Sequence, residues 1–198
     1  MKIKNLFLFF LLLLNGVTFG QNIDINLLKQ INISRNKNLD NFNIFITNTA
    51  TPLALGAPAL GYFIGKFSFD STLKKKSLIS EITVISSLAI TEIIKYTFNR
   101  QRPFQKYPFI KNIVSETGPS FPSGHTTEAF SFAASLSLNY PYWYVIAPSY
   151  LWASMVAYSR MDLGVHYPSD VLAGAIVGIG SAYVCFKLRN WIFNKIYK

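Results

Sequence analysis

The sequence predicts an all-α fold, a transmembrane bundle of five or six helices in one domain. Of its 198 residues, 51% are hydrophobic and 14% are charged, whereas a soluble domain usually carries about 25% charged residues. The apolar residues form long runs, several of them near the roughly 20 residues that a transmembrane helix requires. A disordered chain is excluded, because disordered chains contain few hydrophobic residues.

Residues 1–20 have the pattern of a secretory signal peptide. Two lysines precede the apolar run Leu6–Leu14, and Gly20 stands before polar sequence. The run is shorter than the roughly 20 residues of a span, so we expect cleavage after Gly20. A short first transmembrane helix is the alternative. In both cases the predicted main domain comprises residues 21–198.

Residues 21–40 predict an amphipathic helix. Ile23, Leu27, Leu28 and Ile31 recur at roughly helical spacing among polar residues. Such a helix lies at a membrane interface or over the bundle, and a solvated helix packed on a core is an equally good interpretation.

Five further apolar segments are each predicted to be a helix. They run over residues 42–65, 78–98, 125–138, 143–158 and 171–188. Pro52 and Pro58 predict kinks in the first segment. The third is short for a bilayer. In the last, Gly174 and Gly178 form a GxxxG pattern, which favours close helix packing.

Basic residues predict the orientation of the bundle. Residues 66–76 carry four lysines against one aspartate, and residues 187–198 carry four basic residues and no acid. Alternating helices place both segments on one side, which the positive-inside rule makes cytoplasmic. The loops 99–124 and 160–169 then face the periplasm or exterior. We therefore expect a multi-pass protein of the inner (cytoplasmic) membrane.

The outward loops and the helix ends beside them contain the groups suited to binding an anion. Lys95, Arg102 and Arg160 are cations from separate segments, and arginine can hold an oxyanion with two parallel hydrogen bonds. Ser123 and Gly124 stand where a helix begins, so free backbone N–H groups and the helix dipole favour an anion there.

Both histidines of the chain lie at the same membrane edge. His166 and Asp170 are four residues apart at a helix start, where a carboxylate can fix the imidazole tautomer and raise its nucleophilicity. His125, from the other loop, can protonate a leaving oxygen. With the cations, this set predicts phosphoryl transfer without a metal or other cofactor. Glu128, one turn after His125, has no assigned role.

Three motifs carry a resemblance to a known family. Lys95–Pro103 matches KxxxxxxRP, Pro122–His125 matches PSGH, and Ser159–Asp170 matches SRxxxxxHxxxD. The chain therefore resembles the type 2 phosphatidic acid phosphatase (PAP2) superfamily. The resemblance implies that His166 forms a phosphohistidine, that Asp170 orients it, and that His125 acts as acid and then as base. It also implies that Lys95, Arg102, Ser123, Gly124 and Arg160 bind phosphate.

The resemblance implies a metal-independent membrane phosphatase for a lipid phosphate or diphosphate monoester, such as undecaprenyl diphosphate, phosphatidylglycerophosphate or lipid A. A vanadate-dependent haloperoxidase, which resembles the same phosphate cage, is one alternative. A non-enzymatic lipid-phosphate binder or transporter is another, although binding alone does not require the two histidines and Asp170. The net charge of +10 then reflects a membrane and a phosphate substrate, and not nucleic acid. Membrane members usually have six spans, whereas five remain here if residues 1–20 are cleaved.

Overall fold

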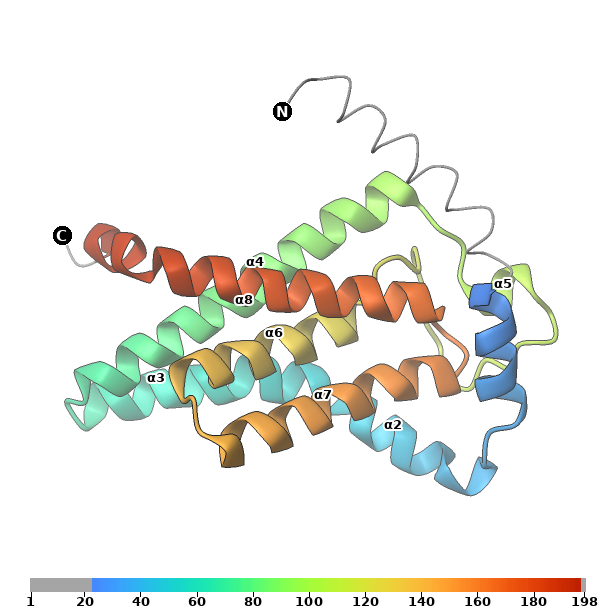
Figure 1. The fold of residues 1–198 in the computed structure, drawn as a ribbon, viewed down its shortest axis with the longest axis horizontal. Coiled ribbons are helices and arrows are strands. Elements are labelled where there is room, and N and C mark those ends of the chain that lie inside the picture. The colour runs from blue at the N-terminus through green and yellow to red at the C-terminus, as the bar shows by residue number, and fades with distance from the viewer. Residues whose placement is uncertain (1–22, 197–198) are drawn as a thin grey trace.

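The computed structural model describes residues 23–196, which form a bundle of long helices (Figure 1). Within these residues all of the regular secondary structure is helical, which confirms the predicted all-α fold. The elements are, in chain order, a helix over residues 23–33, η1 (Lys37–Leu39), α2 (Asp40–Asn48), the π-helical turn η2 (Pro52–Gly56), α3 (Ala57–Phe67), α4 (Ser71–Phe98), α5 (Pro103–Lys106), α6 (Gly124–Asn139), α7 (Trp143–Asp162) and α8 (Pro168–Ile196). The predicted signal peptide lies outside the described residues.

All five predicted apolar segments are helical, and local chemistry sets their ends. The kink expected at Pro52 is the π-helical turn η2, and Pro58 lies where η2 continues into α3. Asp70 caps α4 by accepting hydrogen bonds from two backbone N–H groups. Asn99, with a φ of 42°, ends α4 in the left-handed conformation that terminates many helices.

The helix α6 lies at the centre and packs against α4, α7 and α8. The GxxxG pattern of α8 makes its contact with α6 close: a Cβ atom at Gly174 would lie 2.7 Å from Ser123 O, and one at Gly178 would lie 2.7 Å from Thr127 O. Only glycine allows the two backbones this approach. The contact holds the start of α8 against the start of α6, where the motif residues lie.

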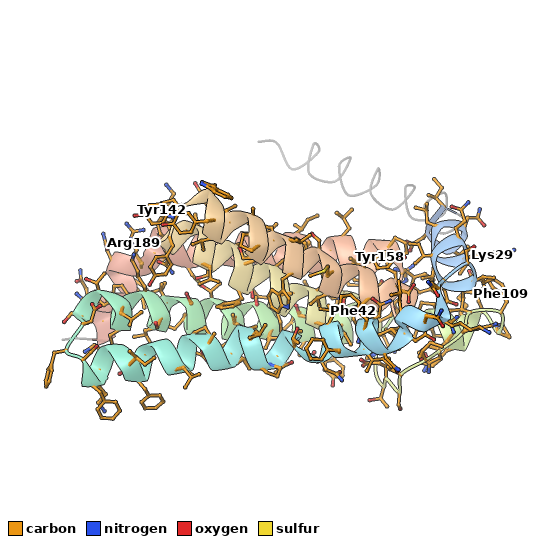
Figure 2. All side chains as sticks on the ribbon, turned by 90° about the horizontal axis from the view of Figure 1, so that it is seen from below. Lys29, Phe42, Phe109, Tyr142, Tyr158 and Arg189 are labelled. Atoms are coloured by element: carbon orange, nitrogen blue, oxygen red, sulfur yellow. The ribbon has the colours of Figure 1, made fainter. Side chains whose placement is uncertain are left out.

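The surface of the bundle is apolar. The stretches Ser71–Lys106 and Pro168–Lys195 are each long and apolar enough to cross a membrane. On their outer faces Ile93 is 68% exposed and Ile176 is 64% exposed. Side chains project from the whole length of the bundle, with Arg189 toward one end and Lys29 toward the other (Figure 2). Such a surface suits lipid better than water.

The helix over residues 23–33 crosses one end of the bundle, as Figure 1 shows in dark blue. Its Leu28 is fully buried and shares an apolar cluster with Ile110 and Tyr167. The Asn32 side chain donates hydrogen bonds to Lys111 O at 2.9 Å and to Asp162 O at 2.8 Å. The amphipathic helix predicted within residues 21–40 therefore lies over the bundle and closes the end that contains the candidate site.

Candidate active site

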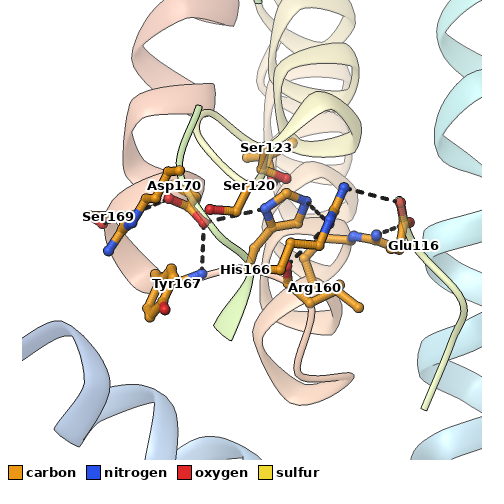
Figure 3. A network of polar contacts seen from close by, with 12 residues as sticks. Glu116, Ser120, Ser123, Arg160, His166, Tyr167, Ser169 and Asp170 are labelled. Carbon is orange, nitrogen blue, oxygen red and sulfur yellow. Dashed lines mark hydrogen bonds and ion pairs between the residues drawn. The ribbon is translucent and has the colours of Figure 1, made fainter. Parts of the chain in front are cut away.

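The candidate site forms where the loop between α4 and α6 meets the turn between α7 and α8 (Figure 3). Gly164, with a φ of 77°, turns the chain between α7 and α8. Ser123 N donates a hydrogen bond to Asp170 O at 3.0 Å, which joins the start of α6 to the first turn of α8. The three sequence motifs therefore converge at one end of the bundle.

His166 is 2% exposed and lies between a carboxylate and a guanidinium group. Its Nδ1 lies 3.4 Å from Asp170 Oδ2, and its Nε2 lies 3.3 Å from Arg102 Nη1. The same Asp170 oxygen accepts a hydrogen bond from Tyr167 N at 2.9 Å, so the carboxylate is itself held in place. This geometry puts the Nδ1 proton toward Asp170 and leaves the lone pair of Nε2 facing the cationic groups.

Burial lowers the pKa of His166 to about 4; Arg160 and Arg102 act in the same direction, and Asp170 opposes them. The ring is therefore neutral at pH 7. A neutral imidazole has the free lone pair that a nucleophile needs, so the electrostatics of the site agree with the role predicted for His166.

The Arg102 side chain is 2% exposed and is held by main-chain oxygens. It donates hydrogen bonds to Val165 O at 3.2 Å, Thr117 O at 2.9 Å and Gly118 O at 3.1 Å. These bonds fix the plane of the guanidinium group, so its two remaining N–H groups have set directions, one toward His166 and one toward Glu116.

Arg160 is 1% exposed, and it reaches the same point from α7. Its Nη1 donates a hydrogen bond to Thr47 Oγ1 at 2.8 Å. Its Nη2 and the Nη2 of Arg102 both pair with the carboxylate of Glu116, at Oε1 and Oε2 respectively. Two buried guanidinium groups thus converge on one anion, and that anion is a side chain of the protein.

The start of α6 supplies a third side of the site. Ser123 is fully buried, and its Oγ accepts a hydrogen bond from Thr126 Oγ1 at 2.9 Å, which leaves its own hydroxyl proton directed elsewhere. A Cβ atom at Gly124 would lie 3.6 Å from Lys95 Nζ, so the lysine ammonium group lies against the first turn of the helix. Lys95 Nζ also pairs with Glu92 Oε1 at 2.9 Å.

His125 follows Gly124 and belongs to the same cluster. It lies within electrostatic reach of Arg160, Glu116, His166 and Lys95. All eight residues predicted from the sequence therefore lie together. Within residues 23–196, no group of three His, Cys, Asp or Glu side chains is arranged to hold a metal ion.

Arg100 and Asp24 are site residues that sequence reasoning did not find. Arg100 Nη1 pairs with Asp170 Oδ1 at 2.6 Å, and Arg100 Nη2 pairs with Asp24 Oδ2 at 2.7 Å. The Arg100 guanidinium carbon lies 3.8 Å from the centroid of the Tyr167 ring. Asp24 lies far from the motifs in sequence, so only the tertiary structure reveals the connection.

Glu128 has a structural partner. Its Oε2 accepts a hydrogen bond from Thr51 Oγ1 at 2.7 Å, which ties α6 to the chain just before η2. Lys95 and Arg160 both act on its charge. Its carboxylate therefore has two roles: it connects α6 to the preceding helical segment, and it lies near the cations of the site.

Known proteins similar in sequence to this chain include phosphatases. The family model of the PAP2 superfamily matches residues 78–194. An undecaprenyl-diphosphatase of Bacillus subtilis is 30% identical over 156 residues, which are 78% of this chain and 77% of that protein. A lipid A 1-phosphatase of Rhizobium etli is 35% identical over 105 residues, which are 48% of this chain and 43% of that protein, so this second match spans less than half of the relative.

Two solved structures have a similar fold over most of their length. The crystal structure of Aquifex aeolicus LpxE has a TM-score of 0.69 at 28% identity and covers 83% of this chain and 95% of its own. A transmembrane PAP2 type phosphatidylglycerolphosphate phosphatase from Bacillus subtilis also has a TM-score of 0.69, at 26% identity, with 97% and 96% covered. The similarity therefore extends over the bundle and not only over the motifs.

Proposed function

This chain belongs to the PAP2 superfamily, and from that premise we propose that it hydrolyses a lipid phosphate or diphosphate monoester through a phosphohistidine intermediate. The observation that carries the proposal is the position of His166, whose Nε2 faces Arg102 while its Nδ1 faces Asp170. A phosphoryl group held by the cations would present its phosphorus atom to this nitrogen.

In the first step, His166 Nε2 attacks phosphorus, the new P–N bond forms, and the bond to the leaving oxygen breaks. The negative charge of the bound phosphoryl group favours the protonated form of His125. His125 then gives its proton to the leaving oxygen, which in a monophosphate substrate belongs to the lipid alcohol. Arg102, Arg160 and Lys95 stabilise the charge on the phosphoryl oxygens, and Ser123 with the backbone N–H of Gly124 adds hydrogen bonds.

In the second step, His125 takes a proton from water, whose oxygen attacks phosphorus and breaks the P–N bond. Inorganic phosphate leaves, and both histidines return to their starting protonation states. Because fixed side-chain cations supply the charge that metal ions supply in other phosphatases, we propose that turnover continues in the presence of a metal chelator.

The charge distribution supports an outward-facing site in the inner membrane. Two basic regions lie at the end of the bundle opposite the site: the turn between α3 and α4, flanked by Lys66 and Lys74–Lys76, and the C-terminal part of α8 (Figure 1). The positive-inside rule makes that end cytoplasmic. The substrate would then be a lipid phosphate of the outer leaflet, and undecaprenyl diphosphate, phosphatidylglycerophosphate and lipid A are the candidates indicated by the relatives.

Phosphate release by the purified protein from these three lipids tests the proposal. We expect release from at least one lipid and none above background with His166→Ala, which should still be recovered in the membrane fraction. Lys195→Gln, at the far end of α8, is the matched control and should retain wild-type activity. Full activity of His166→Ala would exclude the mechanism, and binding without turnover by the wild type would favour a lipid-phosphate binder.

A further inference from the structure

The loop before α6 places a carboxylate between the two buried arginines. Glu116 Oε2 lies 3.4 Å from Arg102 Nη2, and Glu116 Oε1 pairs with Arg160 Nη2 (Figure 3). The arginine side chains are 2% and 1% exposed, whereas that of Glu116 is 22% exposed. Glu116 lies outside the three motifs, so none of the roles proposed above includes it.

The hydrogen bonds of Arg160 are incomplete on the side that faces Glu116. Arg160 Nη1 is bonded to Thr47, and Nη2 is bonded to Glu116. The buried Nε has no hydrogen-bond partner among residues 23–196. Nε and Nη2 together form the edge of a guanidinium group that binds an oxyanion with two parallel hydrogen bonds. Glu116 therefore fills one half of this edge and leaves the other half without an acceptor.

We propose that Glu116 is an internal substitute for the substrate phosphate, which occupies the arginine pair when the site is empty and is displaced when a phosphoryl group binds. The inference rests on the proposed function, because it assumes that Arg102 and Arg160 hold phosphate. It adds a competing group to that site: Glu116 weakens the binding of phosphate and speeds the release of the product.

An internal anion is needed because two buried guanidinium groups repel each other when no counter-ion is present. Burial favours the neutral form of Glu116, but the charges of Arg160 and Arg102 outweigh it, so the pKa of this carboxyl is lowered. The group is therefore a carboxylate at neutral pH. A phosphate dianion offers more charge and more acceptor oxygens than a carboxylate, so it can replace Glu116 at the pair.

The exchange requires movement of the side chain alone. The main chain is held on both sides of Glu116. Ile113 N donates a hydrogen bond to Leu163 O at 3.2 Å, and Ser120 N donates one to Arg100 O at 2.8 Å. The partial exposure of the Glu116 side chain gives the carboxylate a route to solvent without displacement of the loop.

Calorimetric titration of the purified full-length protein with inorganic phosphate tests the inference, because binding is measured without turnover. Glu116→Gln removes the competing charge, and we expect its Kd for phosphate to be about tenfold lower than that of the wild type. Asp40→Asn removes a carboxylate from an ion pair with Arg35, which is not a site residue, and should change the Kd by less than about twofold. Arg160→Gln should abolish the heat signal if phosphate binds at the arginine pair.

Glu116→Asp is the second variant, in case the glutamine variant does not fold with its two arginines uncompensated. It keeps the charge and shortens the reach, so we expect a Kd between those of the wild type and Glu116→Gln. A Kd equal to or higher than that of the wild type in a folded Glu116 variant would overturn the inference, because Glu116 would then only orient the arginines. If the wild type binds phosphate yet releases none from any lipid, the proposed function fails, while the comparison of these Kd values still decides the role of Glu116.

Discussion

At His166 the two ring nitrogens face groups of opposite charge. Nδ1 faces the Asp170 carboxylate, and Nε2 faces the Arg102 guanidinium group. An Arg102 N–H group is directed at the Nε2 lone pair. A bound phosphoryl oxygen can take that N–H group, which frees the lone pair for attack. In the proposed mechanism, binding of the substrate therefore prepares the nucleophile.

The protonation of His166 can be measured directly. Burial and the two arginines lower its pKa to about 4, below the 6.5 or so of an ordinary histidine. NMR titration of the imidazole signals, of which the chain has two, should show His166 neutral down to about pH 5. In Asp170→Asn the pKa should fall further, because the lost carboxylate had favoured the charged form. A His166 titration near pH 6.5 would contradict this account.

The residues of the three motifs could be predicted because each motif combines reactive side chains at a fixed spacing within a short stretch of sequence. Glu116 and Arg100 could not be predicted in the same way. Both belong to the irregular loop between α4 and α6, and no periodic pattern specifies which side chains of such a loop point inward. In the sequence Glu116 is indistinguishable from an ordinary polar loop residue. Only the fold shows that it lies between two arginines.

The helix over residues 23–33 is linked to Asp170 through polar contacts of Asp24. Asp24 Oδ1 accepts a hydrogen bond from Ser169 N at 2.9 Å, and Asp24 Oδ2 pairs with Arg100, which in turn holds Asp170. The sequence predicted an amphipathic helix here, but the pattern did not indicate which residues its polar side chains would contact. Its place across the end of the bundle depends on tertiary contacts such as that of Leu28 with Tyr167.

We expect Asp24→Asn to lower kcat about tenfold and to leave KM within about twofold, because a displaced Asp170 misorients His166. Phosphate-release kinetics measure both constants. The His166 pKa should fall as well, since Arg100 would then neutralise Asp170 more completely. Asp24→Glu should restore part of kcat. An unchanged kcat and an unchanged His166 titration would show that Asp24 has no role beyond folding.

The GxxxG pattern predicted close helix packing in this segment, and the structure shows that the partner of α8 is α6. Glycine substitutions test this contact. A Cβ atom at Gly178 would lie 2.7 Å from main-chain atoms of α6, whereas one at Gly180 would meet nothing within 4 Å. Gly178→Ala should therefore destabilise the protein by about 1–3 kcal/mol through overpacking. Gly180→Ala should be neutral or stabilising, because alanine favours a helix. Thermal unfolding in detergent compares the two variants, and equal melting temperatures would contradict the packing described here.

Across the whole molecule, the charges separate into two groups at opposite ends of the bundle. The turn between α3 and α4, flanked by Lys66 and Lys74–Lys76, lies at one end of the bundle. The C-terminal ends of α4 and α7, which carry Lys95 and Arg160, lie at the other end with α5, which Arg102 precedes (Figure 1). In the proposed orientation the first group faces the cytoplasm, and the second serves the site. The sequence alone predicted this division, because helices that alternate in direction fix which loops share a side of the membrane.

Single cysteines test the proposed orientation. In a Cys185→Ser background, Asn112→Cys lies in the loop of the site, and Ser68→Cys lies between α3 and α4. A membrane-impermeant maleimide should label Asn112→Cys in intact spheroplasts and should label Ser68→Cys only after lysis. The reverse pattern would place the site in the cytoplasm.

Capture of the proposed intermediate tests the central claim most directly. Rapid acid-free quenching during turnover of a lipid labelled in its phosphate, followed by mass spectrometry, locates the transferred phosphoryl group. We predict a phosphoryl group on Nε2 of His166 that is stable to alkali and labile to acid, and none on this peptide in His166→Ala. Consumption of the lipid with no phosphoryl group on His166, or with one on another residue, would contradict the mechanism.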